Sequence, residues 1–385
     1  MSIIKSIVQG LLRWAARRQL AACQPMIVGV TGSSGKTSTK EAIGYVLAKV
    51  LTDRFVVVGS ENLNTEFGLP LVVLGLPKPE GRLAWLRTAT TALARGAFPA
   101  QRKQPVVLVL EYGVEQPGDM KTLVAIARPT LAVVTNVGEA HTQFLGSVAN
   151  VAREKGQLVR ALPASGLAVL NGSDDRVRAM QDLTTAQSVL IRAAPADLSV
   201  ELAVAVAERG FGIPVAVARR ALKDWERPTG RLRLYPGLRS STILDDTYNA
   251  NPLSMTLALS ELKRLGAERR AERRIAVLGD MLELGEEENR VHTGVALLAE
   301  TAADLVILVG PRFRRTQRGT WFPGPLPAAE HLRGLVAPGD LVLVKGSQSM
   351  RMEKVVEAIL DPSLDPTQSL VRQTSAWKQK PYVAP

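Results

Sequence analysis

The sequence contains very little cysteine and no long apolar run. Cys23 is the only cysteine among 385 residues, which excludes an internal disulfide bond and disfavours a metal site built from thiolates. A lone thiol is typical of proteins from a reducing compartment, so we expect a cytoplasmic protein. No stretch approaches the roughly 20 uninterrupted apolar residues that span a bilayer, and we therefore expect no transmembrane helix.

Acidic residues are fewer than basic ones, with 36 Asp and Glu against 48 Lys and Arg. The resulting net charge of +12 favours anionic small molecules such as nucleotides as ligands. Arginine is spread along the chain and gathers in only one short cluster, so no nucleic-acid partner is expected. That this cluster forms a small surface on which nucleic-acid bases stack stays open as an alternative. This cluster contains Arg312, Phe313, Arg314, Arg315, Arg318 and Trp321.

The first segment, residues 1–24, has the pattern of a basic amphipathic helix. Its apolar residues recur at helical spacing from Ile4 to Ala15, and its charged residues are all basic. Arginines interrupt the apolar region, which disfavours a signal peptide. We expect the helix to pack on the next domain, and weak membrane contact through it stays open.

Apolar runs alternate with helical patterns along the rest of the chain, which predicts an α/β fold with a mostly parallel sheet. A chain of 385 residues exceeds the usual size of one core, so we expect two domains. These are a central phosphate-loop ATPase domain at 25–227 and a smaller Rossmann-like domain at 228–360, followed by a tail at 361–385. The expected buried strands are 27–31, 106–110, 131–135, 167–170, 242–244, 275–278, 305–309 and 341–344.

The segment GVTGSSGKT, from Gly29 to Thr37, follows an apolar strand and precedes a helical pattern. Backbone N–H groups of such a loop cradle phosphates, while Lys36 would reach the terminal phosphates and the Thr37 hydroxyl would bind Mg²⁺. The segment departs from the general phosphate-loop pattern, which has a glycine where Val30 stands. The expected nucleotide-binding residues are Gly32, Ser33, Ser34, Gly35, Lys36, Thr37 and Ser38.

The loop variant TGSSGKT resembles the ATP loop of the Mur ligase family. Other segments look like blocks of this family in the same order, at 62–70, 110–113, 135–141, 152–156, 245–252, 279–285 and 344–349. The similarity is greatest to members that add D-alanyl-D-alanine. It implies an ATP-dependent carbon–nitrogen ligase that activates a carboxylate as an acyl phosphate and couples it to an amine such as D-alanyl-D-alanine, on a cell-wall peptide precursor.

Three side chains outside the loop are candidate magnesium ligands. Glu111 ends an apolar strand, at the edge of the sheet where ligands bind, and its carboxylate suits the Mg²⁺ of MgATP. His141 alone is as reasonably structural, and Lys155 alone has the pattern of a solvated helical lysine. The resemblance implies instead that both bind a second Mg²⁺, Lys155 as a carbamate. The expected catalytic residues are then Lys36, Glu111, His141 and Lys155.

Other positions match the family's substrate and nucleotide contacts. The resemblance places Asn249 and Asn251 at the adenine and Asp280 near the ribose or phosphates, although the asparagines also suit a turn before Pro252. Further expected substrate-binding residues are Asn62, Asn64, Thr65, Lys345, Ser347 and Ser349. The last two serines equally suit a helix cap.

The sequence departs from the family in substrate recognition. Only about 25 residues precede the phosphate-loop strand, so we expect the family's N-terminal uridine-binding domain to be missing, and a β-rich insertion is short between 171 and 203. A lipid-linked acceptor, or one presented by another protein, therefore stays open. So do a ligase of the folylpolyglutamate or cyanophycin type, a non-catalytic ATP-binding regulator, and a phosphate-loop kinase.

Overall fold

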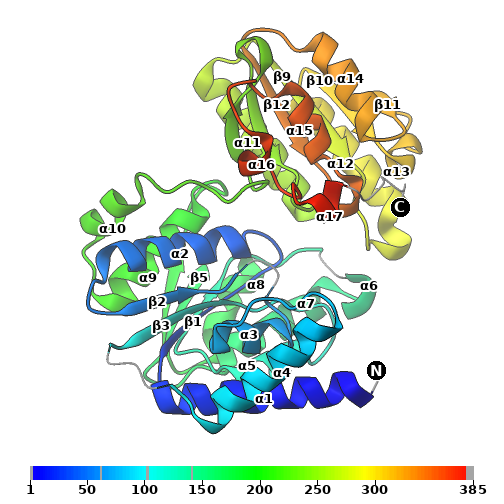
Figure 1. The fold of residues 1–385 in the computed structure, drawn as a ribbon. Coiled ribbons are helices and arrows are strands. Elements are labelled where there is room, and N and C mark those ends of the chain that lie inside the picture. The colour runs from blue at the N-terminus through cyan, green and yellow to red at the C-terminus, as the bar shows by residue number, and fades with distance from the viewer. Residues whose placement is uncertain (1–2, 61–62, 101–103, 140–141, 379–385) are drawn as a thin grey trace. The chain divides into compact units, whose positions relative to one another are not determined.

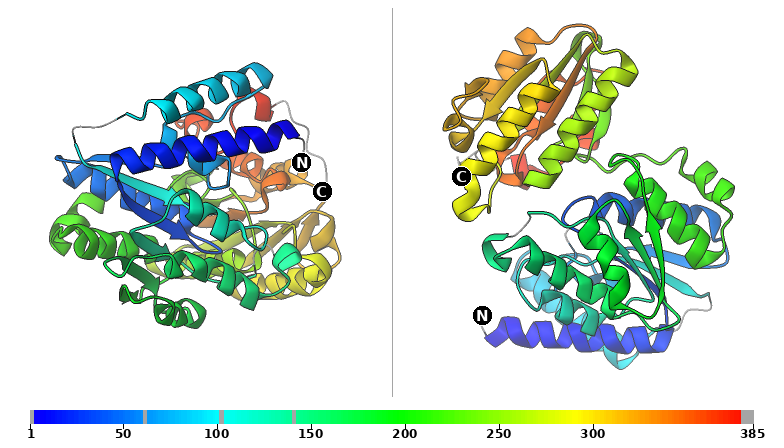
Figure 2. Two further views of the ribbon diagram at one scale, coloured as in Figure 1. Left: turned by 90° about the horizontal axis from the view of Figure 1, so that it is seen from below. Right: turned by 180° about the vertical axis from the view of Figure 1, so that it is seen from behind.

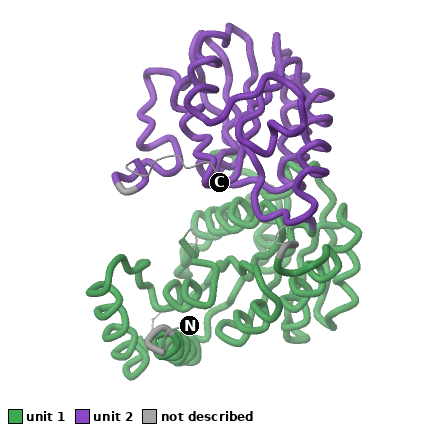
Figure 3. The backbone as a smooth tube through the Cα atoms, turned by 90° about the vertical axis from the view of Figure 1, so that its right-hand side faces the viewer, with its two compact units in different colours: residues 1–137, 144–225 green, residues 138–143, 226–385 purple. Residues whose placement is uncertain are grey.

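The computed structural model describes residues 3–60, 63–100, 104–139 and 142–378. The chain divides into two compact units, shown in Figure 3. Unit 1 comprises Met1–Val137 and Phe144–Trp225, and unit 2 comprises Gly138–Gln143 and Glu226–Pro385. Each unit is built around its own six-stranded sheet, which confirms the predicted α/β fold with a second α/β region after the first.

The sheet of unit 1 is entirely parallel and has the order β2-β3-β1-β4-β5-β6. Its strands are β1 Met26–Thr31, β2 Phe55–Val58, β3 Val106–Glu111, β4 Leu131–Val134, β5 Leu167–Asn171 and β6 Gln187–Ile191. The chain proceeds from β1 to β2 and β3 on one side and then crosses to β4 on the other. Such a reversal leaves a crevice at the carboxyl ends of the central strands, where open α/β sheets bind ligands.

Helices cover both faces of this sheet (Figure 1). One core layer packs residues of α1 Ile3–Cys23, α3 Gly68–Leu74, α4 Arg82–Ala97, α5 Asp119–Ile126, α7 Val148–Arg160 and α8 Asp175–Arg178 against the sheet. The other packs α2 Lys36–Val50, α9 Leu198–Phe211 and α10 Val215–Leu222. A 3₁₀ helix at Ala179–Leu183 completes the unit, and the chain re-enters it from unit 2 within the short helix α6 Thr142–Leu145. Alternate strand residues join opposite layers, as a pleated strand requires.

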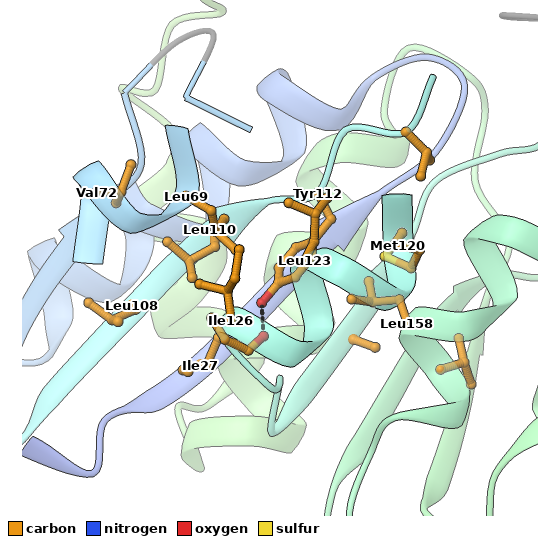
Figure 4. Close-up of a cluster of buried hydrophobic side chains, with 14 of the residues drawn as sticks. Ile27, Leu69, Val72, Leu108, Leu110, Tyr112, Met120, Leu123, Ile126 and Leu158 are labelled. Carbon is orange, nitrogen blue, oxygen red and sulfur yellow. Dashed lines mark hydrogen bonds between the residues drawn. The ribbon is translucent and has the colours of Figure 1, made fainter. Parts of the chain in front are cut away.

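A tyrosine closes the first core layer beneath the crevice (Figure 4). Tyr112 follows β3, is fully buried, and donates a hydrogen bond from its hydroxyl to the Ala127 carbonyl at 2.6 Å. Burial raises the pKa of Tyr112, so the hydroxyl stays protonated. Its backbone N–H donates to Val30 O at 2.8 Å, which continues the pairing of β3 with β1 past the last strand residue.

Unit 2 has a sheet of order β11-β10-β9-β12-β8-β7, in which only β7 is antiparallel. The strands are β7 Arg233–Pro236, β8 Thr242–Asp246, β9 Arg273–Gly279, β10 Leu305–Val309, β11 Thr320–Phe322 and β12 Asp340–Lys345. The helices α11 Pro252–Arg269 and α12 Glu288–Ala302 pack on one face. The helices α14 Pro325–Leu335 and α15 Glu353–Ile359 pack on the other. Short helical turns lie at α13 Pro311–Arg314, Leu238–Ser240, Gly285–Glu287 and Gln348–Met350.

The end of the described chain folds back onto unit 2 through α16 Pro366–Ser369 and α17 Ser375–Lys378. Arg372 lies between them and pairs with the buried Glu353 at 2.9 Å. Its guanidinium also donates to backbone carbonyls of Thr247 and Tyr248. This segment therefore braces the loop after β8. Across both units, no helix among the described residues combines the length and the apolar character that crossing a membrane requires.

Candidate active site

The turn between β1 and α2 contains two glycines whose backbone conformation would be strained in any other residue. Gly32 has φ of +152°, and a Cβ there would lie 1.9 Å from the Thr135 hydroxyl oxygen. Gly35 has φ of +75° and begins α2 without a side-chain cap. N–H groups at such a helix start lack intrahelical acceptors and commonly bind phosphate. The turn therefore has the backbone geometry of a phosphate loop.

Two residues at the end of β4 hold this turn. The backbone carbonyl of Asn136 accepts from Ser33 N–H at 2.9 Å, and its side-chain oxygen accepts from Ser34 N–H at 2.7 Å. The Thr135 hydroxyl donates to Ser34 O at 2.6 Å. Sequence reasoning did not single out either residue for this role. Both lie in the segment 135–141, but the contacts that give them this role join positions 101 and 102 residues apart, which no local pattern records.

Glu111 lies next to the phosphate loop. Its carboxylate, at the carboxyl end of β3, accepts from the Thr37 hydroxyl at 2.8 Å and from the Asn64 amide at 2.9 Å. Thr37 and Glu111 are both buried. The structure therefore brings together three residues that the sequence predicted from widely separated segments.

Lys155 extends from α7 to the same loop, and it is buried rather than solvated. Its side-chain amine donates to Gly32 O at 3.0 Å, and the amine of Lys36 donates to the same oxygen at 2.9 Å. Burial, and next the positive charge of Lys36, hold the pKa of Lys155 well below its usual range. Among the described residues, no carboxylate lies within ion-pairing distance of Lys155, so its amine is biased toward the neutral form.

Two predicted site residues, Asn62 and His141, lie outside the described residues. Thr65 is exposed, and its hydroxyl accepts from Gly68 N–H at 3.4 Å at the start of α3. Within the described ranges there is no group of three or more His, Cys, Asp or Glu side chains arranged for a metal. The loop instead has the Glu111 carboxylate and the Thr37 hydroxyl in contact with each other, and their oxygens are the candidate metal ligands.

A second set of predicted residues meets at the carboxyl ends of β8 and β12 in unit 2. Lys345 is buried, and its amine lies 2.6 Å from the Asp246 carboxylate and 2.9 Å from Asn249 O. The side-chain oxygen of Asn249 accepts from Gln348 N–H at 3.3 Å. Sequence reasoning did not single out Asp246, which neutralises the lysine. Lys345 therefore sits in a local ion pair beside the turn that follows β8.

Other predicted residues of unit 2 have structural partners. Asn251 caps α11 in a reciprocal capping box, accepting from Ser254 N–H at 2.8 Å. Asp280 is buried and accepts from Arg312 and Phe313 N–H groups, both at 2.9 Å. Burial raises the pKa of Asp280 to about 6. Ser347 accepts from Leu282 N–H at 3.1 Å, whereas Ser349 is exposed.

The arginine cluster expected after a buried strand lies partly on the short helix α13. Its guanidinium groups contact acidic or aromatic neighbours within unit 2. Arg312 and Arg315 lie 2.6 and 3.5 Å from the Glu288 carboxylate, Arg318 lies 2.6 Å from Glu300, and Arg314 lies over the ring of Trp321. Most arginines of the cluster therefore already have a partner within unit 2.

Comparison with known proteins identifies the family. Residues 30–198 match the Mur ligase middle domain, and residues 230–348 match the Mur ligase glutamate ligase domain. The UDP-N-acetylmuramoyl-tripeptide--D-alanyl-D-alanine ligase of Mycobacterium tuberculosis is 31% identical over 91% of this chain and 76% of its own length. The chain belongs to the Mur ligase family. The enzyme of the same name from Escherichia coli is 27% identical over 91% of this chain and 79% of its own length.

Solved structures agree with this Mur ligase in fold. The MurF structure from Acinetobacter baumannii matches with a TM-score of 0.74 at 23% identity, covering 91% of this chain and 80% of that one. MurF ligase from Thermotoga maritima, solved in complex with ADP, matches with a TM-score of 0.73 at 24% identity, covering 91% and 83%. The phosphate loop and Glu111 of this Mur ligase lie within the matched middle domain, and Lys345 within the matched glutamate ligase domain.

Proposed function

We propose that this chain is an ATP-dependent ligase that joins D-alanyl-D-alanine to the peptide of a UDP-N-acetylmuramoyl-tripeptide or a similar cell-wall precursor. Relatives with this activity in their names match 91% of the chain. The structural observation that carries the proposal is the hydrogen bond from Thr37, at the end of the phosphate loop, to Glu111 at the adjacent strand end. It joins a phosphate-binding turn to a carboxylate suited to a metal.

The phosphate loop would bind the triphosphate of ATP. The start of α2 offers backbone N–H groups, and Lys36, already directed to the loop carbonyl of Gly32, can turn to the terminal phosphates. The acceptor carboxylate would attack the γ-phosphate to give an acyl phosphate and ADP. The amine would then attack the acyl carbon and release phosphate. Lys36 would favour the first step by neutralising charge that accumulates on the transferred phosphoryl group.

The residues present fit a magnesium ion. Mg²⁺ in nucleotide sites is held by one or two carboxylates together with phosphate oxygens and water, and Glu111 with Thr37 supplies oxygen donors of this kind. When bound, the ion would neutralise phosphate charge. Asn64 would orient the Glu111 carboxylate by the hydrogen bond that it already donates.

A second ion would be bound by His141 and by a carbamate formed on Lys155. The neutral amine of Lys155 would add to CO₂, forming an N–C bond and releasing one proton, which converts a neutral amine into an anionic oxygen ligand. Two features support this reaction. Lys155 is only 2% exposed and shares one carbonyl acceptor with the charged Lys36, so the folded chain disfavours its protonated form.

Unit 2 would supply contacts to the nucleotide and to the amine component. Asn249 and Asn251 would lie at the adenine and Asp280 near the ribose or phosphates. Lys345 would bind the carboxylate of the incoming dipeptide, together with Ser347 and Ser349. The ion pair with Asp246 supports the lysine's role by holding its amine at the carboxyl end of β12 before substrate arrives. We also propose the domain boundaries predicted at residues 24, 227 and 360. A cytoplasmic location of the protein is part of the same proposal. So is an acceptor that is lipid-linked or presented by another protein.

Phosphate release from MgATP tests the proposal directly. The purified chain would be supplied with UDP-N-acetylmuramoyl-tripeptide and D-alanyl-D-alanine, together and singly. We expect release only when both are present, and at limiting Mg²⁺ much less release from Glu111→Gln but not from Glu115→Gln, which changes an exposed carboxylate on the following segment. Release with a folate or another acid and glutamate, and not with the tripeptide, would move the chain to another branch of the family. ATP binding without release under every pairing would favour a regulatory role.

A further inference from the structure

The helices α1 and α4 form a surface on unit 1 that the ATP chemistry does not use. They pack side by side, as the view from below in Figure 2 shows. A Cβ on Gly96 of α4 would lie 2.2 Å from the Trp14 ring of α1, so the glycine allows the ring to lie directly against the helix. The two helices therefore behave as one layer, which we term the α1–α4 face.

The outward side of α4 is a continuous apolar stripe. Leu83, Leu86 and Leu93 are 79%, 63% and 53% exposed, and Phe98 at the end of the helix is 84% exposed. With the exposed Thr90 and Ala97, the leucines are spaced three and four residues apart, which places them on one line along the helix. A surface helix of a globular protein normally directs such a stripe inward.

Helix α1 also exposes two large apolar side chains. Ile7 is 64% and Trp14 is 41% exposed. Together with the four residues on and after α4, they make six of the eleven large hydrophobic residues that are exposed among the described residues: Ile7, Trp14, Phe55, Leu83, Leu86, Leu93, Phe98, Phe144, Val215, Leu297 and Leu326. Apolar side chains scattered singly need no explanation, but a concentration of this kind marks an interaction surface.

The charges on the α1–α4 face are all of one sign. Neither helix contains an aspartate or glutamate. The nearest carboxylate along the chain before α4 is the exposed Glu80, two residues before the helix begins. The exposed charged residues on the two helices are Arg17, Arg18, Arg82, Arg87 and Arg95. Arg82 and Arg87 flank the leucine stripe on its two sides at helical spacing.

We propose that the α1–α4 face binds the surface of an anionic lipid bilayer, with its leucines and Trp14 in the interfacial region. Arg82 and Arg87 would lie at the lipid head groups, since Arg17, Arg18 and Arg95 donate to backbone carbonyls of the protein. An apolar stripe flanked by arginines is the pattern of helices that lie in a membrane interface, and tryptophan favours the same depth. A second copy of the chain fits less well. A symmetric contact through this face would bring arginines against arginines with no carboxylate on either helix to pair them.

Binding to vesicles tests this proposal without using catalysis. The full chain would be mixed with vesicles of equal parts phosphatidylglycerol and phosphatidylcholine, or of phosphatidylcholine alone, and separated by flotation. We expect binding to the anionic vesicles, at least about tenfold weaker binding to the neutral ones, and release at high salt, which screens the arginines.

Paired variants separate the apolar contribution from the charged one. Leu86→Gln with Leu93→Gln should lower the partition coefficient by about tenfold for each leucine. Arg82→Gln with Arg87→Gln should lower it by about fivefold for each arginine, which corresponds to the ~1 kcal/mol that a basic residue contributes near an anionic surface. As a matched control, Leu297→Gln with Leu326→Gln changes two exposed leucines of unit 2 and should bind like the wild type.

Several outcomes would overturn the proposal. The wild type would fail to float with anionic vesicles, or would float equally with neutral ones, or the α4 leucine pair would bind like the control pair. Self-association in the absence of lipid, lost in the α4 leucine pair, would assign the face to a second copy instead. Because all of these substitutions lie on exposed side chains far along the sequence from Lys36 and Glu111, phosphate release should be unchanged, and a failed vesicle test would leave the ligase proposal intact.

Discussion

Replacing Lys155 by methionine should abolish ligase activity while leaving the fold as stable as before, or more so. Methionine has nearly the volume of the lysine stem but carries no amine. In the wild type that amine is buried, is not paired with a carboxylate among the described residues, and contacts the same carbonyl oxygen as Lys36. The substitution therefore removes a poorly solvated cation from the neighbourhood of another.

The expected size of the effect follows from these contacts. Replacing buried charged groups by apolar ones of similar volume is often neutral or stabilises by about 1–4 kcal/mol. The lost hydrogen bond to Gly32 O offsets about 1 kcal/mol. That oxygen is not left without a donor, because Lys36 still donates to it at 2.9 Å. Where the replacement stabilises, the net change is then about 0–3 kcal/mol in favour of the variant, and each kcal/mol shifts Tm by roughly 2–4 °C for a unit of this size.

The pH dependence has a defined sign. The folded chain lowers the pKa of Lys155 below its ordinary value of 10.5, so the unfolded chain binds more protons between the two values. Stability of the wild type consequently rises with pH in that window, and the advantage of methionine should shrink as the pH rises from 7 toward 10. Thermal unfolding in buffer depleted of CO₂ measures this advantage, and phosphate release measures activity.

Lys40→Met provides a matched control. Lys40 is also fully buried, but it lies 3.0 Å from the Glu41 carboxylate and donates to Gly59 O. Removing one partner of such a pair leaves the other unpaired, so this variant should lose stability. A Lys155→Met chain that retains activity would refute the carbamate. One that loses as much stability as Lys40→Met would show that Lys155 is a structural cation and that the reasoning from burial is wrong.

Three further predictions concern the loop, the metal and unit 2. Glu111→Gln should raise the Mg²⁺ concentration for half-maximal phosphate release by about 10- to 100-fold, because the carboxylate next to Thr37 is lost; unchanged Mg²⁺ dependence would exclude it as a ligand. Gly32→Ala should abolish ATP binding in calorimetry, because its Cβ would lie 1.9 Å from the Thr135 hydroxyl; adding Thr135→Ala should restore part of the binding, since the remaining contacts are 3.1 and 3.2 Å. Burial raises the pKa of Asp245 to about 6 from 3.8, so the folded state binds a proton before the unfolded state does as pH falls. The wild type should therefore gain about 1 kcal/mol relative to Asp245→Asn between pH 7 and pH 5 in chemical denaturation, and a gain in the opposite direction would contradict the assignment.

The central strands could be predicted from the sequence, and the edge strands could not. Each of the eight expected runs lies on or overlaps an observed strand, because central strands of a parallel sheet are buried on both faces and read as continuous apolar runs. The four strands without a prediction are β2, β6, β7 and β11, and all lie at the edges of the two sheets. Their residues are largely half-buried or exposed, and β6, β7 and β11 lack an uninterrupted apolar run of four residues. β2 does have such a run, FVVV, which the prediction missed.

The residues of the candidate site also divide into those that could be predicted from the sequence and those that could not. The residues proposed to perform chemistry lie in short motifs. Thr37 and Glu111 could be found from their patterns, whereas Lys155 was found only through the resemblance to the family. Residues that hold them could not be predicted. Asn136 fixes the phosphate loop through one backbone and one side-chain oxygen, and Asp246 pairs with a lysine 99 positions away, so both roles depend on contacts between distant segments that no local pattern records.

The three buried lysines show how structure adds to the motif argument. The side chains of Lys40, Lys155 and Lys345 are all almost completely buried from solvent. Lys40 and Lys345 have carboxylates at 3.0 and 2.6 Å, the arrangement that makes burial of a charge tolerable. Lys155 has instead a second lysine at its acceptor oxygen. The compensation for its charge is the hydrogen bond to Gly32 O and the carboxylates of Glu111 and Glu154, which lie beyond ion-pairing distance, and this favours a lysine that acts in another chemical form.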